Sequence, residues 1–214
     1  MATRRVDRWT KQSAARALAD IGRRFYTRGW VMGTSGNFSV VRSTRPMRLV
    51  ISASSVPKGT MRVKDFLEVN DRGAAVERRA PRPSAETLLH VEIARLRGAG
   101  AVLHTHSIWS TLLSQHFVAG GGLAIEGLEM LKGLSGVTTH EHREWIPILP
   151  NDQDMTRLSE RLVAVLAAHP QCHAVLLSGH GMYTWGDRLA DAERHVEILE
   201  FLLEVTGRRM GPWH

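Results

Sequence analysis

The stretch Ala101-Val-Leu-His-Thr-His-Ser107 decides how the rest of this sequence is interpreted. Its apolar start follows a glycine-rich turn and predicts a buried strand. Side chains two residues apart on a strand point to the same face, so His104 and His106 can reach one ion. The stretch therefore predicts a pair of metal ligands at one edge of a sheet. The alternative is two surface histidines that bind nothing.

A third ligand is predicted at His180, where the apolar run 174–178 enters a turn flanked by glycines. Three neutral imidazoles and an open position are typical of catalytic zinc, although other divalent metals accept the same ligands. A rival pair, His140 and His142, has the same spacing. No apolar run leads into it, so we expect an exposed segment that cannot hold ligands rigidly.

Length and composition predict one domain over residues 1–214, with a core large enough to need no disulfides. The single cysteine, Cys172, excludes an internal disulfide and fits a reducing compartment. No apolar stretch has transmembrane length, and residues 1–10 are basic without the apolar core of a signal peptide. We therefore expect a cytoplasmic protein with no membrane partner.

The formal net charge is +7. A basic chain raises the question of nucleic acid as a partner. However, the arginines are scattered among acids, and no basic strand with interleaved aromatics is present. The sequence thus argues against nucleic-acid binding, whereas its excess positive charge suits small anions such as sugar phosphates.

Hydrophobic spacing predicts an α/β domain, a sheet with helices on both faces. Helices are expected over residues 9–26, from about 85 to 96 after Pro83 and Ser84, and over 107–116, 152–169 and 189–205. Strands are expected over residues 37–41, 48–52, 66–70, 146–149, 174–178 and 182–185, and within 101–107, where one strand carries both His104 and His106. His195, in the last helix, is interpreted as a surface or interface residue, and Tyr183 and Trp185 as core or interface aromatics.

Two polar turns look like an anion site. The first, Thr34-Ser-Gly-Asn37, offers hydroxyls, an amide and a glycine that lets a ligand approach the backbone. The second, Ser52-Ala-Ser-Ser-Val-Pro-Lys-Gly59, adds the positive charge of Lys58. Taken singly, each segment is better explained as an ordinary polar turn, because serine, glycine and asparagine favour turns for conformational reasons alone. Together they favour phosphate binding.

These motifs carry a resemblance that covers about residues 10–207. Thr34–Asn37, Ser52–Ser55, Pro83-Ser-Ala-Glu86, His104–Ser107 and Gly179-His-Gly181 occur in the order and rough spacing of the class II aldolase/adducin family. The resemblance implies a three-layer α/β/α fold with a central mixed, largely antiparallel sheet. It also implies one Zn²⁺ per subunit, usually in a homotetramer with its sites near subunit interfaces.

Carried over residue by residue, the resemblance implies the metal ligands and a set of phosphate-binding residues. The metal ligands are His104, His106 and His180. The phosphate-binding residues are Thr34, Ser35, Gly36, Asn37, Ser54, Ser55, Lys58 and Ser84. The metal ligands and the two polar turns are also those that the sequence indicates by itself.

Two glutamates match acid/base positions in different branches of the family, Glu86 in the aldolases and Glu129 in a branch that removes water. Three segments resemble the second branch: Gly127-Leu-Glu-Met-Leu-Lys-Gly133, Ile146-Pro-Ile-Leu-Pro150 and His180-Gly-Met-Tyr-Thr-Trp-Gly186. We therefore prefer Glu129 as the base and expect a pKa moved towards neutrality. Without the resemblance, Glu86 is simply a first-turn acid and Glu129 an exposed helical one.

The reaction that this resemblance implies is zinc-dependent dehydration of 5-methylthioribulose 1-phosphate to 2,3-diketo-5-methylthiopentyl 1-phosphate in methionine salvage. Two other functions stay open. One is a sugar-phosphate aldolase or pentulose-phosphate 4-epimerase of the fuculose or ribulose phosphate type. The other is a non-enzymatic scaffold of the adducin kind, against which the intact histidines argue.

Overall fold

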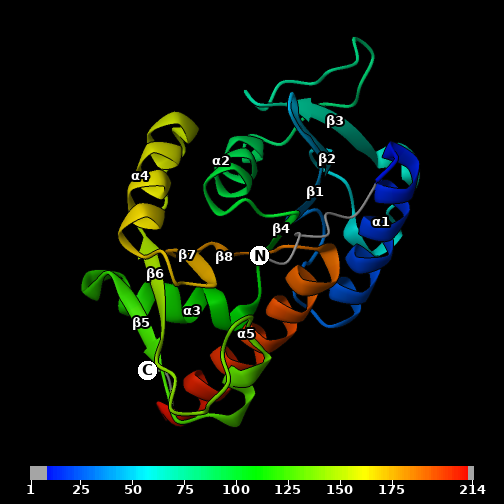
Figure 1. Ribbon diagram of the computed structural model, residues 1–214. Coiled ribbons are helices and arrows are strands. Elements are labelled where there is room, and N and C mark those ends of the chain that lie inside the picture. Colours follow the sequence, from blue (N-terminus) through cyan, green and yellow to red (C-terminus); the bar gives the residue numbers. More distant parts are fainter. Residues whose placement is uncertain (1–8, 212–214) are drawn as a thin grey trace.

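The computed structural model describes residues 9–211 (Figure 1). Residues 1–8 and 212–214 lie outside this part, and with them most of the basic N-terminal segment, including Arg4, Arg5 and Arg8. Within residues 9–211, no helix combines the length and the apolar character that crossing a membrane would require.

The described part of the chain contains five α-helices and eight strands. The helices are α1 (Lys11–Thr27), α2 (Thr87–Arg97), α3 (Ile108–Phe117), α4 (Met155–Ala168) and α5 (Leu189–Arg209). The strands are β1 (Asn37–Thr44), β2 (Met47–Ser52), β3 (Phe66–Asn70), β4 (Ala101–Thr105), β5 (Gly122–Ile125), β6 (Glu144–Leu149), β7 (Ala174–Leu177) and β8 (Gly181–Gly186). Four short 3₁₀ helices are η1 (Lys58–Thr60), η2 (Val63–Asp65), η3 (Val118–Gly120) and η4 (Glu129–Gly133).

The strands form one eight-stranded sheet in the order β3-β2-β1-β4-β8-β7-β6-β5. All neighbouring pairs are antiparallel except β6 and β7, which are parallel. The expected mixed, largely antiparallel sheet is confirmed. The sequence patterns do not predict β5, which has only four residues and begins on a glycine.

Two apolar cores lie on opposite faces of the sheet, as the three-layer expectation requires (Figure 1). One core contains buried residues of α1, α3 and α5, and the other contains those of α2 and α4. His195 of α5 belongs inside the first layer, which corrects its interpretation as a surface residue. It is 3% exposed, its Nδ1 donates to the carbonyl oxygen of Trp185, and its Nε2 meets the backbone and hydroxyl of Ser135.

The centre of the sheet brings three chain segments into register. Asn37 of β1 is the antiparallel partner of His104 on β4, and His104 is the partner of Tyr183 on β8. Cross-strand partners share a face of the sheet, so these three side chains point the same way. They face the layer that contains α2, since Tyr183 belongs to the core shared with that helix.

Candidate metal centre and anion pocket

Three histidines converge where β4 ends and where the chain turns from β7 into β8. His104 is the fourth residue of β4, His106 follows the last, and His180 occupies the turn. The Nε2 atom of His104 lies 2.8 Å from Nε2 of His106 and 3.3 Å from Nε2 of His180. The strand alternation of His104 and His106 thus brings both imidazoles to one point, as the spacing predicted.

The ring orientations fit a metal ion. Nδ1 of His104 lies 2.9 Å from the carbonyl oxygen of Met182, which can only accept, so this nitrogen carries the proton. Nδ1 of His180 lies 3.3 Å from Oδ1 of Asn151. In these tautomers the Nε2 atoms of His104 and His180 face one another and can offer their lone pairs to one cation. Histidine ligands of metals are held in this way by a second oxygen partner.

Glu86 completes this group. Its Oε1 lies 2.9 Å from Nε2 of His180 and 3.6 Å from Nε2 of His104, and all four residues offer ligand atoms within 4.8 Å of one another. Burial by itself raises the pKa of Glu86, but positive charge on His104 and His180, with the hydrogen bonds of protonated imidazoles, outweighs this and brings the pKa below its ordinary value. With that charge present Glu86 is ionised at neutral pH. The expected movement of the pKa towards neutrality is wrong for Glu129 as well, because its hydrogen bond to Lys132 lowers the pKa.

The neighbouring cavity collects the predicted phosphate residues. It is lined by Thr34, Ser35, Gly36, Asn37, Ala53, Ser54, Ser55, Ser84, Glu86 and His106. The hydroxyl of Ser35 is buried without a hydrogen-bond partner among the described residues, as expected of a group that meets a ligand. The anion pocket and the histidine cluster share Glu86 and His106, so one small molecule can occupy both.

Backbone conformation explains two residues of the pocket. Gly36 has a φ of +75°, and a Cβ atom there would lie 2.6 Å from the carbonyl oxygen of His104, so only glycine lets this turn approach β4. Ser55 has a φ of 60°, which is uncommon for a residue with a side chain. Such strained turns expose backbone N–H groups and occur where ligands bind.

Lys58 lies behind the wall of the pocket and does not face the space where a ligand would bind. Its side chain is 1% exposed and is absent from the residues that line the cavity. Its Nζ donates to the carbonyl oxygens of Thr34 and Val56, each at 2.9 Å, and thereby joins the two polar turns. Burial lowers the pKa of Lys58 to about 8, against the opposing charge of Glu86. The structure does not place this ammonium group in direct reach of a phosphate.

Glu129 is not brought to the histidines within one chain. It begins η4, its side chain is 71% exposed, and its carboxylate pairs with Lys132 at 2.5 Å and with His140 at 3.8 Å. Neither the anion pocket nor the ligand group contains it. Of the two predicted acid/base carboxylates, only Glu86 lies in the site of the chain that carries it.

A second group of metal-type side chains, His142, Glu144 and His173, lies at the start of β6 and beside β7. The Glu144 carboxylate is buried and accepts hydrogen bonds from the backbone of His173 and from both imidazoles. Burial alone lowers the pKa of His173, but its contacts with Glu144 outweigh burial and raise it. A buried ion pair therefore accounts for this group, and the rival pair of His140 and His142 does not converge as a pair.

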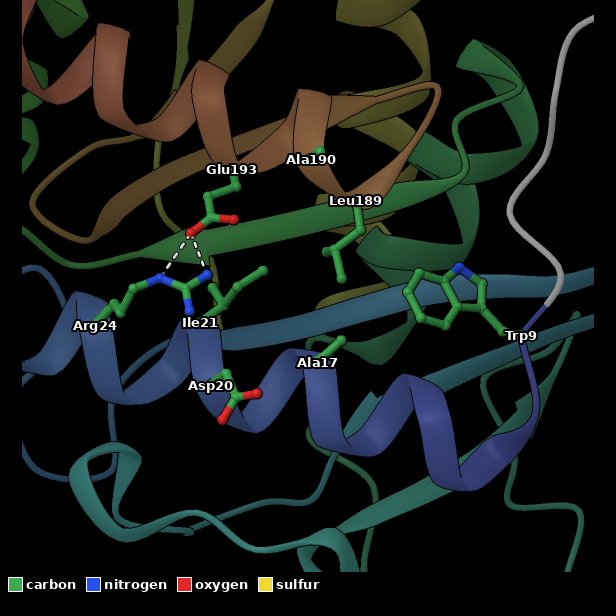
Figure 2. Close-up of a pocket in the computed structure, with 8 residues that line it drawn as sticks. All are labelled: Trp9, Ala17, Asp20, Ile21, Arg24, Leu189, Ala190 and Glu193. Atoms are coloured by element: carbon green, nitrogen blue, oxygen red, sulfur yellow. Dashed lines mark hydrogen bonds and ion pairs between the residues drawn. The ribbon is translucent and has the colours of Figure 1, made fainter.

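A separate groove lies between α1 and α5 and shares no residue with the histidine cluster (Figure 2). The ion pair between Arg24 and Glu193 crosses it, and Trp9 closes one end. Its remaining lining residues are Ala17, Asp20, Ile21, Leu189 and Ala190. Leu189 and Ala190 belong to α5, and the other three to α1. This set offers neither converging nucleophiles nor metal ligands, so the chemistry lies at the other site.

The sequence patterns missed His90, which lies beneath the site. It is fully buried on α2, and its ring contacts Asn37 and Ser39 of β1. Two signals point to it: His90 follows Glu86 by four residues, which is one helical turn, and Asn37 and Ser39 alternate on one face of a strand. Neither signal is specific without the knowledge that the two elements pack together.

The fold and the site define a class of protein. Residues 16–206 match the family described as "Class II Aldolase and Adducin N-terminal domain", which spans most of the chain. The chain therefore belongs to the class II aldolase/adducin family, as its motifs indicated.

Relatives within the family are similar over almost their whole length. The methylthioribulose-1-phosphate dehydratase of Methylococcus capsulatus is 43% identical over 94% of this chain and 96% of its own. The protein of the same name from Pseudomonas aeruginosa is 42% identical over 91% and 93%. Among solved structures, L-fuculose-1-phosphate aldolase from Thermus thermophilus is 25% identical, with a TM-score of 0.73 over 94% of this chain and 97% of its own.

Proposed function

We propose that this protein removes water from 5-methylthioribulose 1-phosphate to give 2,3-diketo-5-methylthiopentyl 1-phosphate, a step of methionine salvage. The observation that carries the proposal is that the anion pocket and the histidine cluster share Glu86 and His106. One phosphorylated ketose can therefore place its phosphate among the polar turns and its carbonyl end at the histidines. The named relatives, at 42–43% identity over more than nine-tenths of the chain, support this substrate.

The dehydration requires the removal of one proton from carbon and the departure of one hydroxyl group. The proton on C3 is acidified by the C2 carbonyl, and the ionised carboxylate of Glu86 is the nearby group that can accept it. Loss of the C4 hydroxyl, which takes up a proton, releases water. The electron pair of the former C3–H bond then forms the C3–C4 double bond of an enol, which becomes the 2,3-diketone.

A divalent cation, for which we propose Zn²⁺, would be held by His104, His106 and His180, and when bound it acts as a Lewis acid that stabilises negative charge developing on the substrate oxygens. The chain itself orients these imidazoles through Met182 and Asn151. The polar turns fix which end of the ketose faces Glu86.

We also propose a homotetramer in the cytoplasm. The single, buried cysteine, Cys172, supports the reducing compartment, and membership of the family supports the assembly.

Product analysis tests the reaction. The purified protein, loaded with zinc, is expected to convert methylthioribulose 1-phosphate to the diketone with release of one water, and to leave fuculose 1-phosphate uncleaved. Mass spectrometry and the absorbance of the diketone follow both reactions. Retro-aldol cleavage of fuculose phosphate, with no diketone from the methylthio sugar, would instead favour the aldolase function that the resemblance to L-fuculose-1-phosphate aldolase suggests.

Alanine substitutions test the anion pocket. Replacement of Thr34, Ser54 or Ser55 by Ala is expected to raise KM by an amount equivalent to about 1–3 kcal/mol, the usual worth of hydrogen bonds to charged groups. Steady-state kinetics measures this effect. Ser43→Ala is the matched control, because this serine lies on β1 outside the pocket. If KM is unchanged in all three variants, these turns do not bind the phosphate and have only a structural role.

A further inference from the structure

Helix α2, which packs behind the site, places the buried His90 next to Asn37, the residue that donates a hydrogen bond to Glu86. His90 of α2 is 0% exposed, and each of its ring nitrogens has one polar partner. Nδ1 lies 2.8 Å from the hydroxyl of Ser39, and Nε2 contacts Oδ1 of Asn37. The amide nitrogen of Asn37 in turn donates to Oε2 of Glu86 at 2.5 Å. These contacts form an unbroken line from the core of the protein to the candidate base.

The donors in this line point in one direction. An amide nitrogen only donates, and that of Asn37 lies against Oε2 of Glu86, so the amide oxygen faces His90. An amide oxygen also only accepts, so Nε2 of His90 carries a proton. Complete burial lowers the pKa of His90 below its ordinary value, so the ring is neutral and its Nδ1 accepts from the hydroxyl of Ser39.

The same contacts change the role expected of Asn37. One hydrogen of its amide nitrogen meets Glu86, and the nitrogen also lies 3.3 Å from the hydroxyl oxygen of Ser84. Both amide hydrogens are therefore occupied within the protein, although the residue lines the anion pocket. Asn37 is built to hold the carboxylate rather than to donate to a phosphate.

We propose that Ser39, His90 and Asn37 form a positioning relay for Glu86. We call these three residues the His90 relay. It ties Oε2 of Glu86 to the protein and leaves Oε1 facing His180 and His104. Hydrogen bonds that run in one direction strengthen one another in a dry interior. The relay thereby fixes the rotamer of the base, and two of its members, Ser39 and His90, lie outside the residues that line the anion pocket. The proposal rests on the function proposed above only in naming Glu86 as the base.

The first test reads the proton on His90 without any turnover. In zinc-loaded protein with ¹⁵N-labelled histidine, nitrogen NMR at neutral pH is expected to show His90 as the neutral Nε2–H tautomer, with no proton on Nδ1. The His90→Gln variant assigns the signal. A proton on Nδ1, or a doubly protonated ring, would overturn the relay. Because no substrate is present, this result stands whatever reaction the protein catalyses.

The second test separates positioning from packing. His90→Leu, which cannot donate to Asn37, is expected to lower kcat about 10–100-fold with zinc content retained and KM changed less than kcat, the usual cost of losing an outer partner of a site. His90→Gln, whose amide nitrogen can donate to Oδ1 of Asn37, is expected to recover most of kcat. Leu89→Ala is the control, since it removes packing from the same helix outside the relay and should lower Tm with kcat intact.

Equal loss of kcat in His90→Gln and His90→Leu would overturn the proposal, as would a fall in kcat of the same size in Leu89→Ala. If the methylthio sugar proves not to be a substrate, the three variants are compared on the ketose phosphate that the wild-type protein does turn over. Failure of the proposed function and failure of the relay are therefore seen separately.

Discussion

Replacement of His104, His106 or His180 by alanine is expected to remove the bound divalent metal and almost all turnover. Each of these imidazoles supplies one Nε2 atom to the same point, and a site with three histidine ligands rarely keeps its metal after one of them is lost. Loss of a Lewis acid worth several kcal/mol of transition-state stabilisation corresponds to a fall in kcat/KM of roughly 10³-fold or more.

Metal analysis of the purified variants, together with kinetics after zinc is added back, measures this effect. His140→Ala is the matched control, because His140 is exposed and lies outside both groups of metal-type ligands. One metal per subunit is expected in the wild type and in this control. Full occupancy in His180→Ala, with loss in a His142 variant, would move the metal to the group around Glu144.

Replacement of Glu86 by glutamine is expected to lower kcat by roughly two to four orders of magnitude, the range for loss of a general base. Glutamine keeps the shape of the side chain but cannot accept the C3 proton. The three imidazoles stay in place, so the metal content should change little and KM less than kcat. Single-turnover kinetics with the deuterated C3 substrate checks that proton removal is the step that slows.

Glu129→Gln provides the comparison. Within one chain this carboxylate is exposed and paired with Lys132, so the variant is expected to keep near-normal turnover. An inactive Glu129→Gln beside an active Glu86→Gln would reverse the assignment in favour of the preference drawn from sequence. Mixed oligomers of inactive Glu129→Gln and metal-deficient His104→Ala then test where Glu129 acts. Recovered activity would mean that Glu129 of one subunit serves the histidine site of a neighbouring subunit.

Much of the site follows from short-range pattern. His104 and His106 share a face because side chains alternate along a strand, and the glycine-flanked turn after residues 174–178 brings His180 to the same edge. The polar turns are recognisable because serine, glycine and asparagine in two places suit an anion. These features depend on a few neighbouring residues, so the sequence carries them directly.

The features that sequence patterns miss depend on packing between distant elements. The direction of the Lys58 side chain is set by two carbonyl oxygens on different turns, which no local pattern reveals. The helix that carries His195 looks amphipathic in sequence, which suggests a surface position for this residue. In the structure, however, His195 is enclosed by contacts with Trp185 and Ser135. The parallel pairing of β6 and β7 and the short strand β5 likewise depend on neighbours that the chain reaches only after long connections. The same limit hides the link between His90 and Glu86.

The clamp that Lys58 places on the turns around Thr34 and Val56 has a consequence for inhibitor design. Because one buried ammonium group already joins both turns, the pocket is assembled before any ligand arrives, and binding has no loop-ordering cost to overcome. The difference in binding free energy between a phosphorylated inhibitor and the same compound without its phosphate should then equal the contribution of the phosphate contacts alone. Rigid phosphate mimics that match the pocket's shape should gain more here than flexible ones.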